Sequence, residues 1–428
     1  MPMVFIITVA LVLAGCGGSS GGSDDGCSVT EQNRFVHEDM LEYYYWYQFV
    51  PESVDYDRFD SPRQLLEYLK YAQYDRFSYI ADQSEFEDLI FDGTYIGYGL
   101  SYVVESASSA RIRFVYSDSP AGRVGILRGD QILSINGQDV AVIIAANSWD
   151  SVFGPDEIGL PLSIRLRRSS GQIVTLDMTK DRVRINTVLH SEVIDIGAPP
   201  NLVRVGYLVF NSFLQTSVAE LDTVFANFKS NGVNRLILDL RYNGGGSVDV
   251  ARRLASYIRN TTVSNSDLFI ELRYNDKHMS DNFNYYFLPE PNSLGLNELT
   301  VVTTAATCSA SELVISALRP YFGRVTTIGD ASCGKPVGMN PINFCDKTLL
   351  AVNFASFNKN GEGDYFDGIP ADCAAVDDVS RVFGDQQESM LATALQYENN
   401  TAACRAAPPL RSRPAAETYD LRAIVGAV

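Results

Sequence analysis

The stretch that most constrains the fold is a strand that runs into a short turn and then into a helix. Residues 299–304 are rich in β-branched side chains between polar residues, which is typical of a strand. After the turn, Leu313, Ala317 and Leu318 recur at helical spacing. Ser309 lies in the turn, where its oxygen can point out of the sheet edge beside the positive end of a helix. This geometry is typical of a nucleophilic serine.

A helix cap is the alternative explanation of the same turn. Ser309 or Ser311 could cap the helix, because Ser-x-x-Glu runs are common at helix starts. Cys308 is a second possible nucleophile. Adjacent residues of an extended chain point to opposite faces, so only Ser309 or Cys308 can face a given cleft. The turn by itself leaves a cap and a nucleophile open.

Strands and helices alternate over residues 186–400, which indicates an α/β core. Within it, a triple-glycine turn at residues 244–246 follows a buried strand and precedes a helix predicted over residues 248–258. Free N–H groups at such a turn attract anions, but the spacing differs from that of nucleotide-binding loops. The same N–H groups can stabilise an oxyanion, at on the order of 3–4 kcal/mol for one donor.

A serine nucleophile also needs a base. The three histidines, His37, His190 and His278, lie in segments without a companion motif, and we predict that they are structural or on the surface. Lys335 lies in a glycine-rich turn after Ser309. A lysine acts as a base only when it is neutral, and burial favours that form by lowering its pKa. A turn lysine taken alone is more often a solvated charge.

The chain begins like an exported protein. Residues 1–15 are almost wholly apolar and lead to Cys16 and a Gly/Ser-rich tether, which resembles a bacterial lipoprotein signal. We expect residues 1–27 to be signal and tether, and Cys16 to carry the lipid. The expected location is the bacterial cell envelope, on its extracytoplasmic side, facing the periplasm in a Gram-negative cell. The lipid is then the only membrane contact.

Charge and cysteines narrow the partners further. The net charge of −18 argues against nucleic acid, because phosphate binding needs a basic surface. Six more cysteines can form up to three disulfides in an oxidising compartment. They show neither paired C-x-x-C spacing nor a histidine cluster, so we predict no metal site. These six are Cys27, Cys308, Cys333, Cys345, Cys373 and Cys404.

Two regions precede the core, and a tail follows it. Residues 28–90 carry aromatic-rich helical patterns, with Ser61 as a predicted helix cap. Residues 91–185 change to short strands and turns. Residues 401–428 have no periodic pattern and form a predicted tail, which Cys404 could pin. The sequence therefore predicts a multidomain α+β protein.

The order of short strands and turns over residues 91–185 resembles a PDZ domain of the bacterial protease type. Such a domain binds an extended peptide as an added strand. Backbone N–H groups of the loop Tyr98-Gly99-Leu100 are expected to hold the terminal carboxylate, and the glycine permits its close approach. A small barrel that only packs between domains is the alternative.

Three motifs in order resemble the C-terminal processing (tail-specific) serine peptidases. They are the glycine turn after residues 239–241, the turn at Ser309 and the turn at Lys335, and the likeness spans about residues 90–375. The resemblance implies a crotonase-like core and a Ser-Lys hydrolase without a cofactor. It assigns Ser309 as nucleophile and Lys335 as general base. The N–H groups of Ala310 and Gly245 would form the oxyanion hole.

The expected protein is an endopeptidase that binds C-terminal tails or unfolded polypeptide segments through the PDZ-like domain and cleaves them. Many relatives carry a glutamine four residues after the lysine, and this glutamine orients the amine. This chain has Met339 at that position. Ser332 or a backbone carbonyl could replace that glutamine, and disulfides of the cysteines that flank the motifs could brace the site. The alternative is a catalytically weak or inactive lipoprotein of the same fold that binds peptides or another ligand. Oligomeric state stays open.

Overall fold

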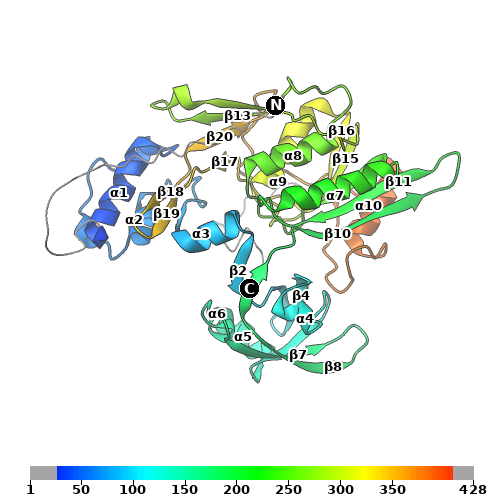
Figure 1. Cartoon of the computed structure of the whole chain (residues 1–428), viewed down its shortest axis with the longest axis horizontal. Coiled ribbons are helices and arrows are strands. Elements are labelled where there is room, and N and C mark those ends of the chain that lie inside the picture. Colours follow the sequence, from blue (N-terminus) through cyan, green and yellow to red (C-terminus); the bar gives the residue numbers. More distant parts are fainter. Residues whose placement is uncertain (1–26, 408–428) are drawn as a thin grey trace.

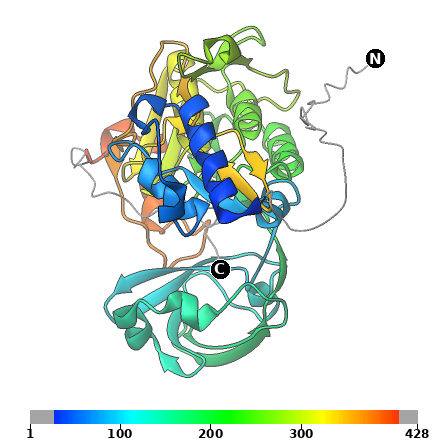
Figure 2. The same ribbon diagram turned by 90° about the vertical axis from the view of Figure 1, so that its left-hand side faces the viewer.

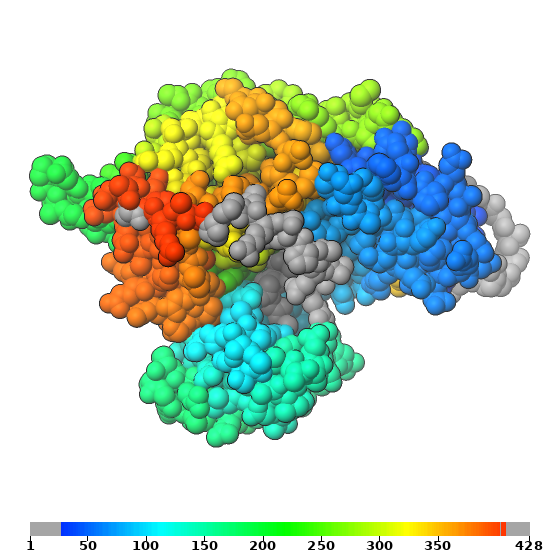
Figure 3. All heavy atoms as spheres, turned by 180° about the vertical axis from the view of Figure 1, so that it is seen from behind, coloured from blue at the N-terminus to red at the C-terminus, as the bar shows by residue number. Residues whose placement is uncertain are grey.

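The computed structural model describes residues 27–407, which form three regions. A helical N-terminal region and a larger core lie side by side, and a β-rich region projects away from both of them (Figures 1 and 2). Seen from behind, the β-rich region stands out as a separate lobe (Figure 3). No helix within residues 27–407 has the length and apolar character needed to cross a membrane. The mixed, multidomain α/β architecture agrees with the predicted fold class.

A six-stranded sheet forms the centre of the core. Its strands, in spatial order, are β10 (Val188–Ile196), β11 (Val203–Phe210), β12 (Arg235–Asp239), β15 (Glu298–Thr303), β16 (Arg324–Gly329) and β21 (Cys373–Ala374). Strands β11 to β21 are parallel, and β10 joins them antiparallel. Parallel strands must be connected by crossovers, which explains why helices alternate with strands along this part of the sequence.

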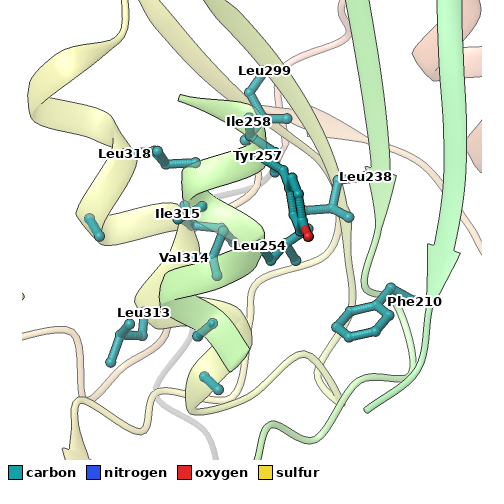
Figure 4. Packing of buried hydrophobic residues seen from close by; sticks show 14 of the residues in the cluster. Phe210, Leu238, Leu254, Tyr257, Ile258, Leu299, Leu313, Val314, Ile315 and Leu318 are labelled. Carbon is teal, nitrogen blue, oxygen red and sulfur yellow. The ribbon is translucent and has the colours of Figure 1, made fainter. Parts of the chain in front are cut away.

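Helices cover both faces of the sheet (Figure 1). One face carries α7 (Ser217–Ser230), α8 (Val248–Ile258) and α9 (Ala310–Leu318), and the other carries α10 (Ser389–Asn399). Successive strand residues point to opposite faces. Leu238 of β12 therefore shares a core cluster with Leu254 of α8 and Val314 of α9 (Figure 4), whereas the preceding Ile237 belongs to the cluster that includes Leu391 of α10.

A second sheet of the core lies beside the predicted catalytic turns. It contains, in spatial order, β14 (Phe283–Tyr286), β13 (Leu268–Tyr274), β20 (Phe354–Phe357) and β17 (Val337–Gly338). β17 begins two residues after Lys335, and its neighbour β20 contributes buried Phe354. This sheet therefore supplies a wall next to the lysine.

The N-terminal region contains α1 (Val29–Glu42), α2 (Pro62–Leu69), β1 (Tyr79–Asp82) and α3 (Gln83–Ile90). The Ser61 side chain accepts a hydrogen bond from the Gln64 N–H, which confirms the predicted cap of α2. β1 pairs with β19 (Lys347–Leu350), which pairs in turn with β18 (Ile342–Phe344). A hairpin from the core segment of the sequence thus completes this region.

The β-rich region has its own apolar core. Its main sheet follows the order β3 (Leu100–Ser106), β4 (Ser109–Val115), β5 (Gln131–Ile135), β7 (Pro161–Arg167) and β8 (Ile173–Thr179), with β6 (Gln138–Asp139) paired to β5. Three short helices pack with it: α4 (Pro120–Arg123), α5 (Val140–Ala146) and α6 (Trp149–Phe153). β2 (Thr94–Gly97) and β9 (Asp181–Arg184) pair where the chain enters and leaves, so a two-stranded ribbon connects the region to the rest.

All six cysteines outside the N-terminal segment form disulfides. The pairs are Cys27–Cys345, Cys308–Cys333 and Cys373–Cys404. The prediction of up to three bonds is confirmed. Cys404 pins the chain after α10 to the edge strand β21, as expected.

Candidate active site

Three turns meet at the carboxyl edge of the central sheet. β12, β15 and β16 are neighbouring parallel strands, so the turns that follow them start side by side. The turn after β12 carries residues 244–246, the turn after β15 carries Ser309, and the turn after β16 carries Lys335. In open α/β sheets this edge is where ligands bind. Motifs that are far apart in the sequence therefore meet in one place.

The three turns line a cavity of about 320 Å³. Ser309, Ala310, Gly246 and Lys335 all contribute to its lining. Apolar side chains make up much of the remaining wall, and they come from the N-terminal region with its β19 strand, the second sheet and the segment after it, and α9: Phe86, Leu350, Leu272, Phe354, Met339 and Leu313. The cavity combines a few convergent polar groups with apolar walls, as small binding sites in proteins usually do.

Ser309 occupies a rare backbone conformation. Its φ is +56° and its ψ is −114°, in the N-cap position of α9. Residues other than glycine seldom adopt such angles, and strain of this kind is common at active sites. Its neighbour Cys308 is buried in a disulfide and does not line the cavity. Of the two adjacent candidates, the structure places Ser309 in the cavity.

Lys335 is buried and lines the same cavity. Burial lowers its pKa to about 7, against the opposing charges of Asp75 and Glu312. Its Nζ lies 5.5 Å from the centre of the Phe77 ring. A substantial fraction of this amine is therefore neutral at neutral pH, unlike a solvated lysine.

Glu312 joins the serine turn to the lysine turn. Its buried carboxylate accepts hydrogen bonds from the N–H groups of Ser309 (2.9 Å), Gly334 (2.7 Å) and Lys335 (2.8 Å). It also accepts the hydroxyl of Ser332. Burial raises the pKa of Glu312, and these four donors oppose that rise. The sequence analysis treated the Ser-x-x-Glu run only as a capping signal and missed this role.

Two residues bear on how the Lys335 amine is oriented, namely Ser332 and Met339. Ser332, one predicted substitute for the missing glutamine, uses its hydroxyl to bind Glu312 and to accept the Ile369 N–H (2.7 Å). Met339, at the glutamine position, lines the apolar part of the cavity. A thioether is only a weak hydrogen-bond acceptor, so Met339 contributes apolar surface to the cavity rather than a strong hydrogen bond.

The glycine turn packs directly against the serine turn. A Cβ atom at Gly245 would lie 2.8 Å from the Ser309 Cβ and 3.1 Å from the Ala310 nitrogen, so a side chain does not fit there. The Gly245 N–H donates to the Asn243 Oδ1 (2.9 Å). This arrangement differs from the expectation that Gly245 donates to an oxyanion, because the side chain of Asn243 already engages that N–H. Gly246, by contrast, lines the cavity.

Buried Arg241 anchors the same turn from behind. Its guanidinium binds Asp239, Glu388 and Asp377, with its shortest contact of 2.7 Å to the Asp239 Oδ2. The Tyr242 hydroxyl bonds to Asp377 as well. It also accepts from Nη1 of Arg128, which belongs to the β-rich region (2.8 Å). The network thus ties the glycine turn to both α10 and the β-rich region.

The predicted peptide loop lies elsewhere. Tyr98 and Leu100 are fully buried in the core of the β-rich region, and neither they nor Gly99 line the cavity with Ser309. Gly99 has φ +80°, and a Cβ there would come within 2.0 Å of the Ser119 Cβ. Its glycine is therefore required by packing, and the binding of a carboxylate stays a prediction. Cys16 lies outside the described residues 27–407.

The histidines are not part of this cavity. The ring nitrogens of His37 contact the Tyr56 hydroxyl and the Pro51 carbonyl, which is a structural role. Across residues 27–407, one group of side chains could approach a metal ion together, namely Cys308, Glu312 and Cys333. The two sulfurs are joined in a disulfide, so neither is a thiolate ligand.

Two protein-family models match this chain. Peptidase family S41 matches residues 204–375, and the peptidase S41 N-terminal domain matches residues 31–79. The chain belongs to peptidase family S41. The larger S41 match runs from β11 to β21 and includes all three turns. The predicted resemblance to C-terminal processing peptidases is confirmed at the level of the family.

Members of the S41 family from plants and bacteria are similar to this chain. The chloroplastic carboxyl-terminal-processing peptidase 2 of Arabidopsis thaliana is 26% identical over 277 residues, which cover 63% of this chain and 51% of the relative. The carboxy-terminal processing protease CtpA of Bacillus subtilis is 25% identical over 300 residues, or 69% and 59% of the two chains. The chain thus spans little more than half the length of these relatives.

A solved structure supports the S41 assignment. A crystal structure of an S41 protein from Bacteroides fragilis aligns with a TM-score of 0.71 at 26% sequence identity. The alignment covers 86% of this chain and 97% of the other. The similarity therefore extends well beyond the segments matched by the family models.

Proposed function

We propose that this chain is a serine endopeptidase of the C-terminal processing type, with Ser309 as nucleophile and Lys335 as general base. One observation carries the proposal. Ser309 and Lys335 line the same cavity, and burial brings the pKa of that lysine to about 7. A base is most effective when its pKa lies near the working pH. Membership of the S41 family supports a peptidase rather than a binding protein.

The proposed reaction proceeds through an acyl-enzyme. Neutral Lys335 accepts the hydroxyl proton of Ser309 while Oγ attacks the scissile carbonyl carbon. The tetrahedral oxyanion collapses, the peptide C–N bond breaks, and the lysine gives its proton to the leaving amine. A water molecule then attacks the ester, with Lys335 again as base, and releases the acid and Ser309. No cofactor takes part in these steps.

Two backbone N–H groups are suited to the oxyanion. Ala310 is the first residue of α9, where unpaired N–H groups and the helix dipole favour negative charge. Gly246 lines the same cavity and replaces Gly245 in the proposed oxyanion hole. Glu312 holds the backbone of Ser309 and Lys335 in register, so the two reacting side chains start from one rigid frame.

We propose that the β-rich region acts as a PDZ-like module that delivers polypeptide tails or unfolded segments to a crotonase-like core. Its strand β3 is the end strand of the sheet order, and an open edge can accept an extended peptide. The loop Tyr98-Gly99-Leu100 immediately precedes or begins that strand. Because the side chains of Tyr98 and Leu100 are buried, only backbone groups of the loop are available for a carboxylate.

We further propose a lipid anchor at Cys16 and a location in the bacterial cell envelope, on its extracytoplasmic side and facing the periplasm in a Gram-negative cell. The apolar N-terminal segment and the Gly/Ser tether are the sequence support. The three disulfides within residues 27–407 fit an oxidising compartment.

Incubation with an unfolded protein tests the catalytic proposal. The full chain should cleave the substrate, and Ser309→Ala should abolish cleavage without loss of folding or peptide binding. Ser316→Ala is a matched control, because Ser316 lies on the same helix and does not line the cavity. Cleavage at the normal rate by Ser309→Ala would end the proposal. Peptide binding without cleavage by the unaltered chain would favour the alternative, a binding protein.

A further inference from the structure

A short segment of the N-terminal region contacts the lysine turn from outside the core. The Arg76 Nη2 donates to the Cys333 carbonyl (2.6 Å) and lies 3.4 Å from the Phe366 carbonyl. The next residue, Phe77, is buried and places its ring 5.5 Å from the Lys335 Nζ. Residues 75–78 are therefore docked on the backbone of the turn and on the amine itself.

Asp75 makes this segment rigid. Its carboxylate is buried, and its Oδ1 accepts the N–H groups of Phe77 and Ser78 (2.9 Å each). Its Oδ2 accepts the hydroxyls of Tyr44 and Ser78 (2.6 Å each). Four donors fix the anion in place, and Tyr44 connects it to the aromatic cluster that follows α1. A charge held in this way acts as a fixed electrostatic partner for neighbouring groups.

We infer that Asp75 is a positioning residue for Lys335: through residues 75–78, the N-terminal region aims the amine at Ser309, in place of an orienting side chain at position 339. This inference rests on the proposed role of Lys335 as base. Met339 contributes an apolar wall to the cavity, so the orienting force must come from other groups.

The charges around the lysine agree with this inference. Burial lowers the pKa of Lys335, and Asp75 and then Glu312 act to raise it. Glu312 faces the turn from α9 and Asp75 faces it from the N-terminal region, and hydrogen-bond donors hold both carboxylates in place. Arg76 is the cation of the docked segment, and it binds backbone carbonyls of the turn. Asp75 is the anion of the docked segment, and its negative charge favours the protonated amine of Lys335.

Asp75→Asn is the informative variant. The amide oxygen can still accept the Phe77 and Ser78 N–H groups, and the hydroxyls of Tyr44 and Ser78 can rotate to accept from the amide nitrogen. Loss of the negative charge should move the acid limb of the kcat/KM profile to lower pH by about one unit. A less well oriented Lys335 amine should reduce kcat about tenfold with little change in KM. Asp75→Glu should restore much of both.

A second readout separates this inference from the proposed function. In the Ser309→Ala background, amine acylation of Lys335 is followed by mass spectrometry as a function of pH, which needs no cleavage. Asp75→Asn should shift this titration to lower pH. Asp39→Asn is the matched control, since Asp39 is another buried acid of the N-terminal region and lies in α1. It should leave the titration unchanged.

The outcomes are decisive in either direction. A folded Asp75→Asn variant with an unmoved acid limb and an unmoved amine titration would overturn the inference. A shifted titration in a chain that never cleaves peptides would support the contact and reject the proposed peptidase. If Asp75→Asn does not fold, Arg76→Met replaces it: reduced kcat with unchanged KM supports docking of the segment, and unchanged kcat overturns it.

Discussion

Two buried cations lie on turns at the same edge of the central sheet, and their surroundings differ. Arg241 is completely buried and has three carboxylates within hydrogen-bond distance, on Asp239, Asp377 and Glu388. Burial acts to lower its pKa, but Asp239 and its other acidic partners outweigh burial and hold the pKa above its ordinary value. Lys335 is equally deep, and burial prevails there, bringing its pKa to about 7.

The difference shows how one sheet edge can hold a permanent charge beside a titrating one. Carboxylates that bind a guanidinium directly offset the cost of its desolvation. Glu312, the buried carboxylate that joins the serine turn to the lysine turn, instead accepts hydrogen bonds from backbone N–H groups. Direct pairing with carboxylates therefore distinguishes the structural cation Arg241 from the proposed catalytic Lys335, whereas burial is common to both.

The largest effect is expected from replacing Lys335 with arginine, which makes both groups permanently charged. Lys335→Arg places a permanently protonated group where the base should be, because arginine does not lose its proton in proteins. We expect kcat/KM to fall by on the order of 10³-fold or more, as for the loss of other catalytic bases. Hydrolysis of a fluorogenic peptide measures the loss, and circular dichroism checks folding. Retained activity in a folded variant would remove Lys335 from the mechanism.

Replacing Arg241 with a neutral residue should instead lower the free energy of unfolding. Arg241→Met leaves Asp239 and Glu388 buried without a counter-ion, which costs about 3–5 kcal/mol of unfolding free energy. Urea titration measures this loss. Lys335→Met, the matched variant, should be as stable as the unaltered chain or more so at pH 7, since it removes a desolvated amine. Equal destabilisation by the two changes would contradict the comparison.

Glu312→Gln tests the link between the two turns with a smaller change. The amide retains one acceptor oxygen, but the other position becomes a donor that faces N–H groups. An unsatisfied buried donor costs about 1–3 kcal/mol, so we expect roughly a 10- to 100-fold loss in kcat/KM. Glu298→Gln, at a partly exposed carboxylate of β15, is the control. Similar losses from both variants would argue against a special role for Glu312.

The last effect is a gradual change of stability with pH. The folded-state pKa of Lys335, about 7, lies below the value of an unfolded lysine, about 10.4. Between these values the unfolded chain binds a proton that the native amine lacks, so stability rises with pH, by at most about 1.4 kcal/mol per unit. The difference between the unaltered chain and Lys335→Met, measured by urea titration from pH 7 to 10, should show this slope. A flat difference would place the native pKa near its ordinary value.

Local patterns predicted much of the fold and of the candidate site. β15 and α9 occupy the predicted segments around Ser309, and α8 covers the residues predicted after the glycine turn. These motifs carry short-range signals of period and turn composition. Their order was enough to indicate the family and to bring Ser309 and Lys335 together as a hypothesis.

Contacts between distant residues were not predictable in the same way. Nothing local marks β1 as the partner of β19, because an exposed strand edge can pair with many segments. The docking of Arg76 on the Cys333 carbonyl joins residues 257 positions apart. Glu312 carried a visible capping signal, but its burial beneath a second turn depends on tertiary packing. The occupied N–H of Gly245 likewise depends on the rotamer of Asn243.

The Cys27–Cys345 bond determines where mechanical load enters the protein. Cys345 lies in the turn between β18 and β19, 318 residues beyond Cys27 in the chain. Tension applied at the N-terminal side of Cys27 passes through this covalent bond into the hairpin that completes the N-terminal sheet. It bypasses the first turn of α1, which would otherwise unravel first. A chain pulled from its N-terminal side therefore loads this hairpin before its first helix.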